Sequence, residues 1–400
     1  MKRMIMTLAA VLVAFAANAQ QSLWGNGEIV SPEIHPDRTV TFRFQAPKAI
    51  RVQVTGDFLP TQKIEIPGHG SYDAPGVADL KEGPAGVWEF TTEPLASELY
   101  NYHFIVDGLE VKDPNNAYLQ RDIANLMNYF IIPGEKGDLY AVGDVPHGTV
   151  SRVWYHSDVL GMDRRLSVYT PAGYETGKEK YPVLYLLHGM GGDEEAWLCL
   201  GRTAEIMDNL IAKGLAKPMI VVMPNGNTKH QAAPGESAEG MFKPYNSGSF
   251  DTTYEAHFKD VIAFVDARYR TIKKASGRAV AGLSMGGGHS FELSLNYPGT
   301  FDYVGLFSAG LGIRRDNGAG YPYPEFYENT DEKIDRLFAN NPKLYYIAIG
   351  ETDFLYDSNK ALREKLDAKG YKYEYFESEG GHIWRNWRIY LTKFAQKIFK

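Results

Sequence analysis

The residue best suited to covalent chemistry in this chain is Ser284, within the sequence GLSMG at residues 282–286. This stretch has the form G-x-S-x-G, follows a short apolar run at 279–281 and opens a segment with helical character. A serine in a sharp strand-to-helix turn has its Oγ exposed, and the flanking glycines prevent collisions with the neighbouring strand and helix. The bare pattern arises often by chance, but its place between a strand and a helix makes it specific. We therefore predict that Ser284 is a nucleophile.

A serine hydroxyl is a poor nucleophile until a base accepts its proton, so a histidine must lie near it. Among the ten histidines, His289 lies on the helix just beyond Ser284 and cannot turn back to it. His188 and His257 precede the serine, whereas folds with this turn supply their partners in the order Ser, acid, His. His382 follows the serine, in a loop before the expected terminal helix. His382 is the predicted base.

The acid that orients this histidine is expected at the end of the penultimate strand, where the apolar run at 344–349 leads into GETD. Asp353 closes that stretch and is the predicted acid. Its carboxylate would hold the imidazole in the right tautomer and stabilise the imidazolium. Asp357 is the alternative, although it also fits a helix N-cap. Glu351 falls closer to the strand end and is less suitable.

A tetrahedral intermediate needs backbone amides that bind its oxyanion. One is expected to be the amide of Met285, directly after the nucleophile. The other is expected in the loop HGMGG at 188–192, and we assign it to Met190. His188 is expected to hold this loop rather than to act in catalysis. The sequence contains no His-x-x-x-His, no pair of cysteines and no Walker lysine, so no metal or cofactor is expected.

Short apolar runs alternate with helical segments in the C-terminal part of the chain. This alternation is typical of a doubly wound sheet, with the active site at the carboxyl ends of the strands. An α/β-hydrolase domain is therefore expected at residues 149–400. The runs lie at 183–187, 219–223, 279–281, 304–307 and 344–349.

The N-terminal part has a different pattern. Residues 40–44, 50–54 and 100–106 alternate apolar with polar side chains, as half-buried strands do. Asp107 and Gly108 follow the last of these and form a strong hairpin signal, because both turn positions need positive φ. An all-β, immunoglobulin-like sandwich is expected at 20–132, followed by a Gly- and Pro-rich linker at 133–148.

The first residues have the features of a secretion signal, with Lys2 and Arg3, an apolar stretch and small residues before a cleavage site near Ala19. The stretch is too short to span a membrane, so we expect an exported protein without residues 1–19. The chain carries 42 Lys and Arg against 49 Asp and Glu residues, which offers no basic face for nucleic acid. The sequence leaves the oligomeric state open.

The part from about residue 147 onward resembles the esterase-D-like branch of the α/β-hydrolases, in particular carbohydrate esterases of family one, which include feruloyl and acetylxylan esterases. The resemblance implies a triad of Ser284, Asp353 and His382, in agreement with the interpretation above. The surroundings of Asp353 match only as a short G-x-x-D. The matching stretches are RLSVYTP at 165–171, YPVLYLLHG at 181–189, VMPNG at 222–226, GLSMGG at 282–287 and Gly381 with His382.

The first module resembles the early-set sandwich of carbohydrate-binding module family 48. The match rests on Trp88 to Phe90, residues 100–108 and Asp113 with Pro114. It implies that Trp88 and Tyr102 could stack on sugar. Their period-two positions favour the sandwich core instead.

Substrate choice is expected to depend on the aromatic loops at 225–249 and 310–330. The predicted substrate-binding residues are Gly189, Asn225, Trp197 and Trp384, of which the two tryptophans are expected to flank the acyl group. An apolar slot suits a hydroxycinnamoyl group better than acetyl. The expected partner is therefore feruloylated plant cell-wall polysaccharide such as arabinoxylan, and acetylated xylan is the alternative.

Three other functions remain in view. A serine peptidase shares the G-x-S-x-G-G turn and would cleave amides strongly. An S-formylglutathione hydrolase belongs to the same branch, but such enzymes are cytosolic, which the export signal opposes. From a different class, the chain could be a glycan-binding protein with an inactive hydrolase fold, which labelling of Ser284 by a fluorophosphonate would exclude.

Overall fold

The computed structural model describes residues 29–66, 70–238, 253–312 and 322–400, so the expected signal at 1–19 lies outside the described residues. The chain divides into two compact units. The first comprises Met1–Leu95 and Tyr102–Ala117, and the second comprises Ala96–Asn101 and Tyr118–Lys400. Residues 118–148 thus group with the second unit, whereas the sequence-based boundaries assigned them to the sandwich and the linker. The domain assignment itself stays a prediction.

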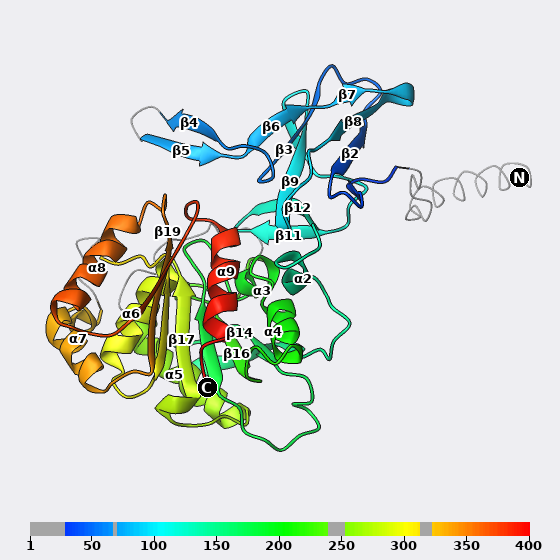
Figure 1. The fold of residues 1–400 in the computed structure, drawn as a ribbon. Coiled ribbons are helices and arrows are strands. Elements are labelled where there is room, and N and C mark those ends of the chain that lie inside the picture. Colours follow the sequence, from blue (N-terminus) through cyan, green and yellow to red (C-terminus); the bar gives the residue numbers. More distant parts are fainter. Residues whose placement is uncertain (1–28, 67–69, 239–252, 313–321) are drawn as a thin grey trace, which may run out of the picture. The chain divides into compact units, whose positions relative to one another are not determined.

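The first unit contains antiparallel strands in the part of it that the structure describes (Figure 1). One sheet has the order β1 (Glu33–Ile34), β2 (Val40–Gln45), β8 (Val87–Thr91) and β7 (Lys81–Glu82), with a 3-10 turn at Pro84–Gly86 before β8. A second set of paired strands comprises β10 (Leu109–Val111), β9 (Leu99–Val106), β3 (Val52–Gly56) and β6 (Gly76–Asp79). A separate hairpin pairs β4 (Gln62–Ile66) with β5 (Gly70–Ala74).

Aromatic side chains fill the core of the first unit. The rings of Phe42 and Tyr102 meet edge to face, with their centroids 4.9 Å apart. Trp88 is buried as well, and its indole N–H donates to the carbonyl of Ala46. The core positions expected for Trp88 and Tyr102 are therefore confirmed. The identity of the unit as an early-set, glycan-binding module stays a prediction.

The second unit is built on an eight-stranded sheet. The first three strands in the sheet are antiparallel neighbours, and the strands from β16 onward are parallel. Their order is β13 (Thr149–Ser157), β14 (Met162–Thr170), β16 (Ile220–Pro224), β15 (Val183–Leu187), β17 (Arg278–Leu283), β18 (Tyr303–Phe307), β19 (Leu344–Gly350) and β20 (Glu374–Ser378). A hairpin of β11 (Leu119–Asp122) and β12 (Asn125–Ile131) belongs to the same unit.

Helices cover both faces of this sheet (Figure 1). On one face, the side chains of Val183, Tyr185 and Leu187 pack with α5 (Thr253–Arg268), α6 (Met285–Asn296), α7 (Thr330–Ala339) and α8 (Tyr356–Ala368). On the other face, Leu184 and Leu186 pack with α3 (Ala196–Cys199), α4 (Thr203–Ala212) and α9 (Trp384–Ala395). Short elements complete the unit: α2 (Gly137–Tyr140) and 3-10 turns at Ala275–Gly277 and Pro324–Phe326.

The strand order reverses at β15. The chain leaves β15 for β16 on one side and returns to β17 on the other side. In open parallel sheets, such a switch point leaves a crevice at the carboxyl ends of the two strands, where ligands bind. The expected doubly wound α/β-hydrolase sheet is confirmed, and its switch point lies between the loop at 188–192 and Ser284.

Candidate active site

Ser284 occupies a strained turn between β17 and α6. Its backbone has φ 52° and ψ −115°, a left-handed conformation that costs energy in a residue with a side chain. The turn is fixed on both sides, because the Ser284 amide donates to the Phe307 carbonyl at 2.9 Å and the Ser284 carbonyl accepts from the Gly310 amide at 2.8 Å. The strain is typical of a serine whose hydroxyl is presented for reaction.

The two glycines of the pentapeptide are required by close packing. A Cβ on Gly282 would lie 2.4 Å from the Gly286 carbonyl oxygen. A Cβ on Gly286 would lie 2.4 Å from the carbonyl oxygen of Leu187. No real Cβ atom tolerates such contacts with backbone, so only glycine allows α6 to approach the end of β15.

His382 and Asp353 form a hydrogen-bonded pair. Asp353 follows β19 and His382 follows β20, and Nδ1 of the imidazole lies 2.9 Å and 3.1 Å from the two carboxylate oxygens. With Nδ1 engaged, Nε2 is the nitrogen that can exchange a proton with substrate or nucleophile. Asp357 is exposed in the first turn of α8, so the structure gives the paired position to Asp353 rather than to the alternative acid.

The electrostatics of Asp353 favour its charged form. Burial raises the pKa of this carboxyl, but hydrogen bonds from His382, from the Leu355 amide and from the Ser308 hydroxyl outweigh burial and lower the pKa overall. Ser308 is itself buried and accepts a hydrogen bond from the Trp387 indole at 3.1 Å. A carboxylate held in this way can orient the imidazole and stabilise its protonated form.

The loop after β15 lies against the nucleophile. A Cβ on Gly189 would be 3.2 Å from the Cβ of Ser284, so the glycine allows the loop backbone to pass beside the serine. Met190 follows Gly189 with an exposed side chain, whereas Met285 is buried at the start of α6. Within the described ranges, neither the Met190 amide nor the Met285 amide is hydrogen-bonded to an acceptor. Both N–H groups are therefore available to an oxyanion.

His188 holds this loop, as the sequence predicted. The Gly226 amide donates to Nε2 at 2.7 Å, and Nδ1 lies 2.7 Å from the Gly189 carbonyl, to which it donates. These bonds require the neutral imidazole. Burial disfavours the charged form and lowers the pKa of His188 to about 4. His188 therefore ties the loop after β15 to the loop after β16.

Two of the predicted substrate-binding residues are occupied in structural roles. Trp197 is 1% exposed, and its indole donates to the Leu187 carbonyl at 2.9 Å. Asn225 is equally buried, donating to Glu194 at 2.9 Å and accepting from the Asn227 amide at 2.8 Å. These contacts hold the segment after β15 and the segment after β16 in position. Met241, Phe242, Tyr245 and Tyr321 of the expected aromatic loops lie outside the described residues.

Aromatic rings surround the histidine. Trp384 is partly exposed, and its ring lies 5.3 Å from Trp197 and 5.1 Å from Trp387, centroid to centroid. Trp387 in turn lies 4.9 Å from the His382 ring. The His382 ring also contacts the Phe354 ring, with their centroids 4.5 Å apart. The sequence pattern did not indicate Phe354 or Trp387, although Phe354 follows the predicted acid directly.

A second group that sequence reasoning missed is the β11–β12 hairpin. Its tip residue Ile123 has φ 56°, and a Cβ on Gly191 would lie 2.4 Å from the Ile123 Cδ1 atom. Arg121 donates to the Ile123 carbonyl at 2.9 Å and to Asp193 at 2.7 Å. The hairpin therefore braces the same loop that carries Met190.

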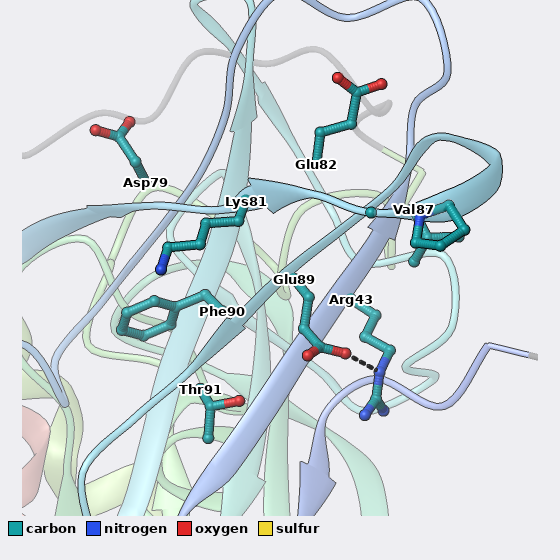
Figure 2. Close-up of a pocket in the computed structure, with 10 residues that line it drawn as sticks. Arg43, Asp79, Lys81, Glu82, Val87, Glu89, Phe90 and Thr91 are labelled. Carbon is teal, nitrogen blue, oxygen red and sulfur yellow. Dashed lines mark hydrogen bonds and ion pairs between the residues drawn. The ribbon is translucent and has the colours of Figure 1, made fainter.

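Two pockets are formed by other residues. One of about 690 Å³ lies in the first unit on β2, β6, β7 and β8, and Figure 2 shows Arg43 paired with Glu89 on its wall. The other, of about 360 Å³, lies in the second unit and is lined by Arg121, Arg152, Glu195 and neighbouring residues. Neither lining includes the predicted catalytic residues.

Two further properties concern the described residues. They bring no group of three or more His, Cys, Asp or Glu side chains together in a geometry that would hold a metal ion. Over the same ranges, every helix is too short or too polar to cross a membrane.

Residues 157–398 match the model of the esterase family, described as "Putative esterase". The chain is also 31% identical over 385 residues to an endo-1,4-beta-xylanase/feruloyl esterase of Xylanibacter ruminicola. This alignment covers 92% of the chain but only 46% of that relative, so the chain spans less than half of its length.

Solved structures show the same architecture. A CE1 ferulic acid esterase from Anaeromyces mucronatus is 25% identical, with a TM-score of 0.52 over 66% of this chain and 95% of that one. The enterobactin esterase of Shigella flexneri is 16% identical, with a TM-score of 0.60 over 90% of this chain and 92% of that one. The second likeness concerns the fold alone.

Proposed function

Because the chain belongs to the esterase family, we propose that it is a secreted serine esterase that removes feruloyl groups from plant cell-wall polysaccharide. The observation that carries this proposal is the His382–Asp353 pair at the same edge of the sheet as the strained Ser284. The strands that end at these residues are parallel, so their carboxyl ends meet.

The proposed reaction is acyl transfer in two steps. Ser284 Oγ attacks the ester carbonyl carbon while His382 Nε2 takes the hydroxyl proton. The carbonyl oxygen becomes an oxyanion that the amides of Met190 and Met285 bind. The carbon–oxygen bond to the alcohol then breaks, and His382 gives its proton to the leaving oxygen. Water repeats the sequence on the acyl-enzyme and releases the acid.

The feruloyl preference is supported by aromatic surroundings. The partly exposed Trp384 lies 5.1 Å from Trp387, centroid to centroid, and Trp387 contacts the His382 ring, so an apolar aromatic surface lies near the histidine. Aromatic acyl groups pack well on such rings. The similarity to a feruloyl esterase of Xylanibacter ruminicola points the same way. Acetylated xylan is the alternative substrate, because an acetyl group needs no such surface. Export is proposed from the sequence of residues 1–19 alone.

The test compares kcat/KM for methyl ferulate and for an acetylated xylo-oligosaccharide. We expect a strong preference for the ferulate ester, with the activity lost in Ser284→Ala. A preference for acetate would replace the feruloyl assignment with deacetylation. If Ser284→Ala hydrolyses both esters as fast as the unchanged protein, the proposed nucleophile is wrong. Failure of a fluorophosphonate to label Ser284 would favour the inactive, glycan-binding alternative.

A further inference from the structure

We propose that Phe354 forms a binding site for the sugar ring of the leaving alcohol, an inference that rests on the esterase function proposed above. Phe354 is 74% exposed, although its chain neighbours Asp353 and Leu355 are buried. Its ring centroid lies 4.5 Å from that of His382, with an interplanar angle of 52°. An aromatic side chain of this exposure is thus in direct contact with the proposed catalytic base.

Exposure alone would carry little weight, since single apolar residues are common on protein surfaces. The backbone on both sides of Phe354 is fixed by hydrogen bonds of the turn around Asp353. The Asp353 carboxylate accepts from the Leu355 amide at 2.9 Å, the Asp353 amide donates to Gly350 at 3.1 Å, and the Tyr356 amide donates to the Asp353 carbonyl at 2.9 Å. The turn that fixes the proposed catalytic acid therefore also fixes the backbone from which the exposed ring extends to the histidine.

The reaction determines which part of the substrate meets this ring. His382 must deliver a proton to the ester oxygen that leaves with the alcohol, so that oxygen lies within about 3 Å of Nε2 at that step. In a feruloylated polysaccharide, the oxygen is attached to a sugar. The sugar ring must then lie against groups around His382, and Phe354 is an exposed apolar surface in contact with that imidazole.

The chemistry of the ring suits this ligand. One face of a sugar ring presents C–H groups, which pack on an aromatic face and remove apolar surface from water. The carbonyl oxygen of the ester would bind instead at the proposed oxyanion amides of Met190, after β15, and Met285, at the start of α6. Phe354 should therefore act on the alcohol half of the ester.

A pair of substrates with the same acyl group isolates this role. The variant Phe354→Ala is compared with the unchanged full-length protein on methyl ferulate and on a 5-O-feruloyl-arabinofuranosyl xylo-oligosaccharide. We expect kcat/KM for the sugar ester to fall about tenfold, the value of one lost ring contact, and kcat/KM for methyl ferulate to change less than twofold. Phe354→Tyr should keep both values.

Leu215→Ala is the matched control, because it truncates another exposed apolar side chain of the second unit, in the connection between α4 and β16. Equal losses on both esters would overturn the proposal, since they would show that Phe354 only positions His382. Unchanged values on both esters would also overturn it. If the unchanged protein hydrolyses acetate but not ferulate esters, the feruloyl assignment fails on its own. In that case, Phe354→Ala is compared with the unchanged protein on acetylated xylo-oligosaccharide and on methyl acetate.

Discussion

Arg121 donates to the carboxylate of Asp193 at 2.7 Å, across 72 residues of sequence, and thereby ties the β11–β12 hairpin to the loop that follows β15. Asp193 is buried, and its second oxygen accepts from the Glu195 amide at 3.0 Å. The Arg121–Asp193 ion pair therefore differs from an exposed surface ion pair, because its carboxylate is buried and bonded a second time. It connects a segment that precedes the sheet to the loop that carries the Met190 amide.

Loss of this bond should weaken oxyanion binding. We expect Arg121→Ala to lower kcat about tenfold with little change in KM. A misplaced amide weakens the stabilisation of the transition state but has little effect on substrate binding. The affinity for a boronic acid, which mimics the tetrahedral intermediate, should fall by a similar factor. Arg121→Lys should restore part of both values.

Arg51→Ala is the control for this prediction, since it breaks an exposed ion pair with Asp79 in the first unit and should leave kcat unchanged. A variant Arg121→Ala with reduced thermal stability but an unchanged kcat and boronate affinity would show that the bond serves the fold alone.

The acid is tested by a matched pair of substitutions. In serine proteases, changing the triad Asp to Asn costs about ten-thousandfold in kcat. We expect a loss of that order for Asp353→Asn, because the amide can no longer hold the imidazole in the required tautomer. Asp357→Asn should lose less than threefold, since that side chain is exposed in the first turn of α8. The measurement is kcat of both variants on the same ester. If Asp357→Asn shows the large loss and Asp353→Asn does not, Asp357 is the acid.

The sequence predicted the residues whose positions follow from local pattern. The apolar runs at 183–187 and 344–349 are the strands β15 and β19, and the glycine-flanked Ser284 is in the expected turn. Asp353 could be selected because it follows the expected strand at 344–349, and His382 because it lies in a loop after the serine and before the expected terminal helix. These features depend on side-chain period and on motif order, both of which are visible in a single chain.

The remaining features depend on contacts between distant residues, which no period records. Arg121 was counted with the sandwich, because it precedes the Gly- and Pro-rich stretch at 133–148 that was interpreted as the linker. Trp197 was interpreted as substrate-binding because it lies just beyond the expected oxyanion loop, and Asn225 because it begins the expected substrate loop at 225–249. The structure buries both, with their polar atoms bonded to the protein. Phe354 was overlooked because exposure beside His382 is a property of the folded chain.

Two buried histidines should make the protein lose stability in mild acid. Burial lowers the pKa of His188 to about 4 and that of His257 to about 3, whereas an unfolded histidine titrates near 6.5. Between about pH 6.5 and 4 the unfolded chain therefore binds protons that the folded protein does not. The free energy of unfolding should fall as the pH falls through this range, by about 1.4 kcal/mol per pH unit for each histidine.

Urea unfolding at several pH values measures this slope. The variant His257→Gln should lower the slope by the contribution of one histidine, because Tyr155 and Tyr254 no longer surround a titratable ring. Leu215→Ala, which truncates an exposed side chain without a titratable group, should leave the slope unchanged. An unchanged slope in His257→Gln would mean that this ring is protonated in the folded protein.

The last prediction concerns the packing of the turn that carries Ser284. It distinguishes a glycine that is required for lack of space from one that is required for its positive φ. A Cβ on Gly286 would lie 2.4 Å and 2.5 Å from the carbonyl oxygens of Leu187 and His188, and backbone cannot move aside. Gly173 has a positive φ of 81°, but its Cβ would meet open space. Gly173→Ala should cost only the backbone strain, about 1–2 kcal/mol. Gly286→Ala should cost more and should abolish hydrolysis, because α6 must shift away from β15 and carry Met285 with it. Thermal unfolding and ester hydrolysis of both variants decide the point, and a Gly286→Ala protein as stable and active as Gly173→Ala would contradict the packing that holds Ser284 in place.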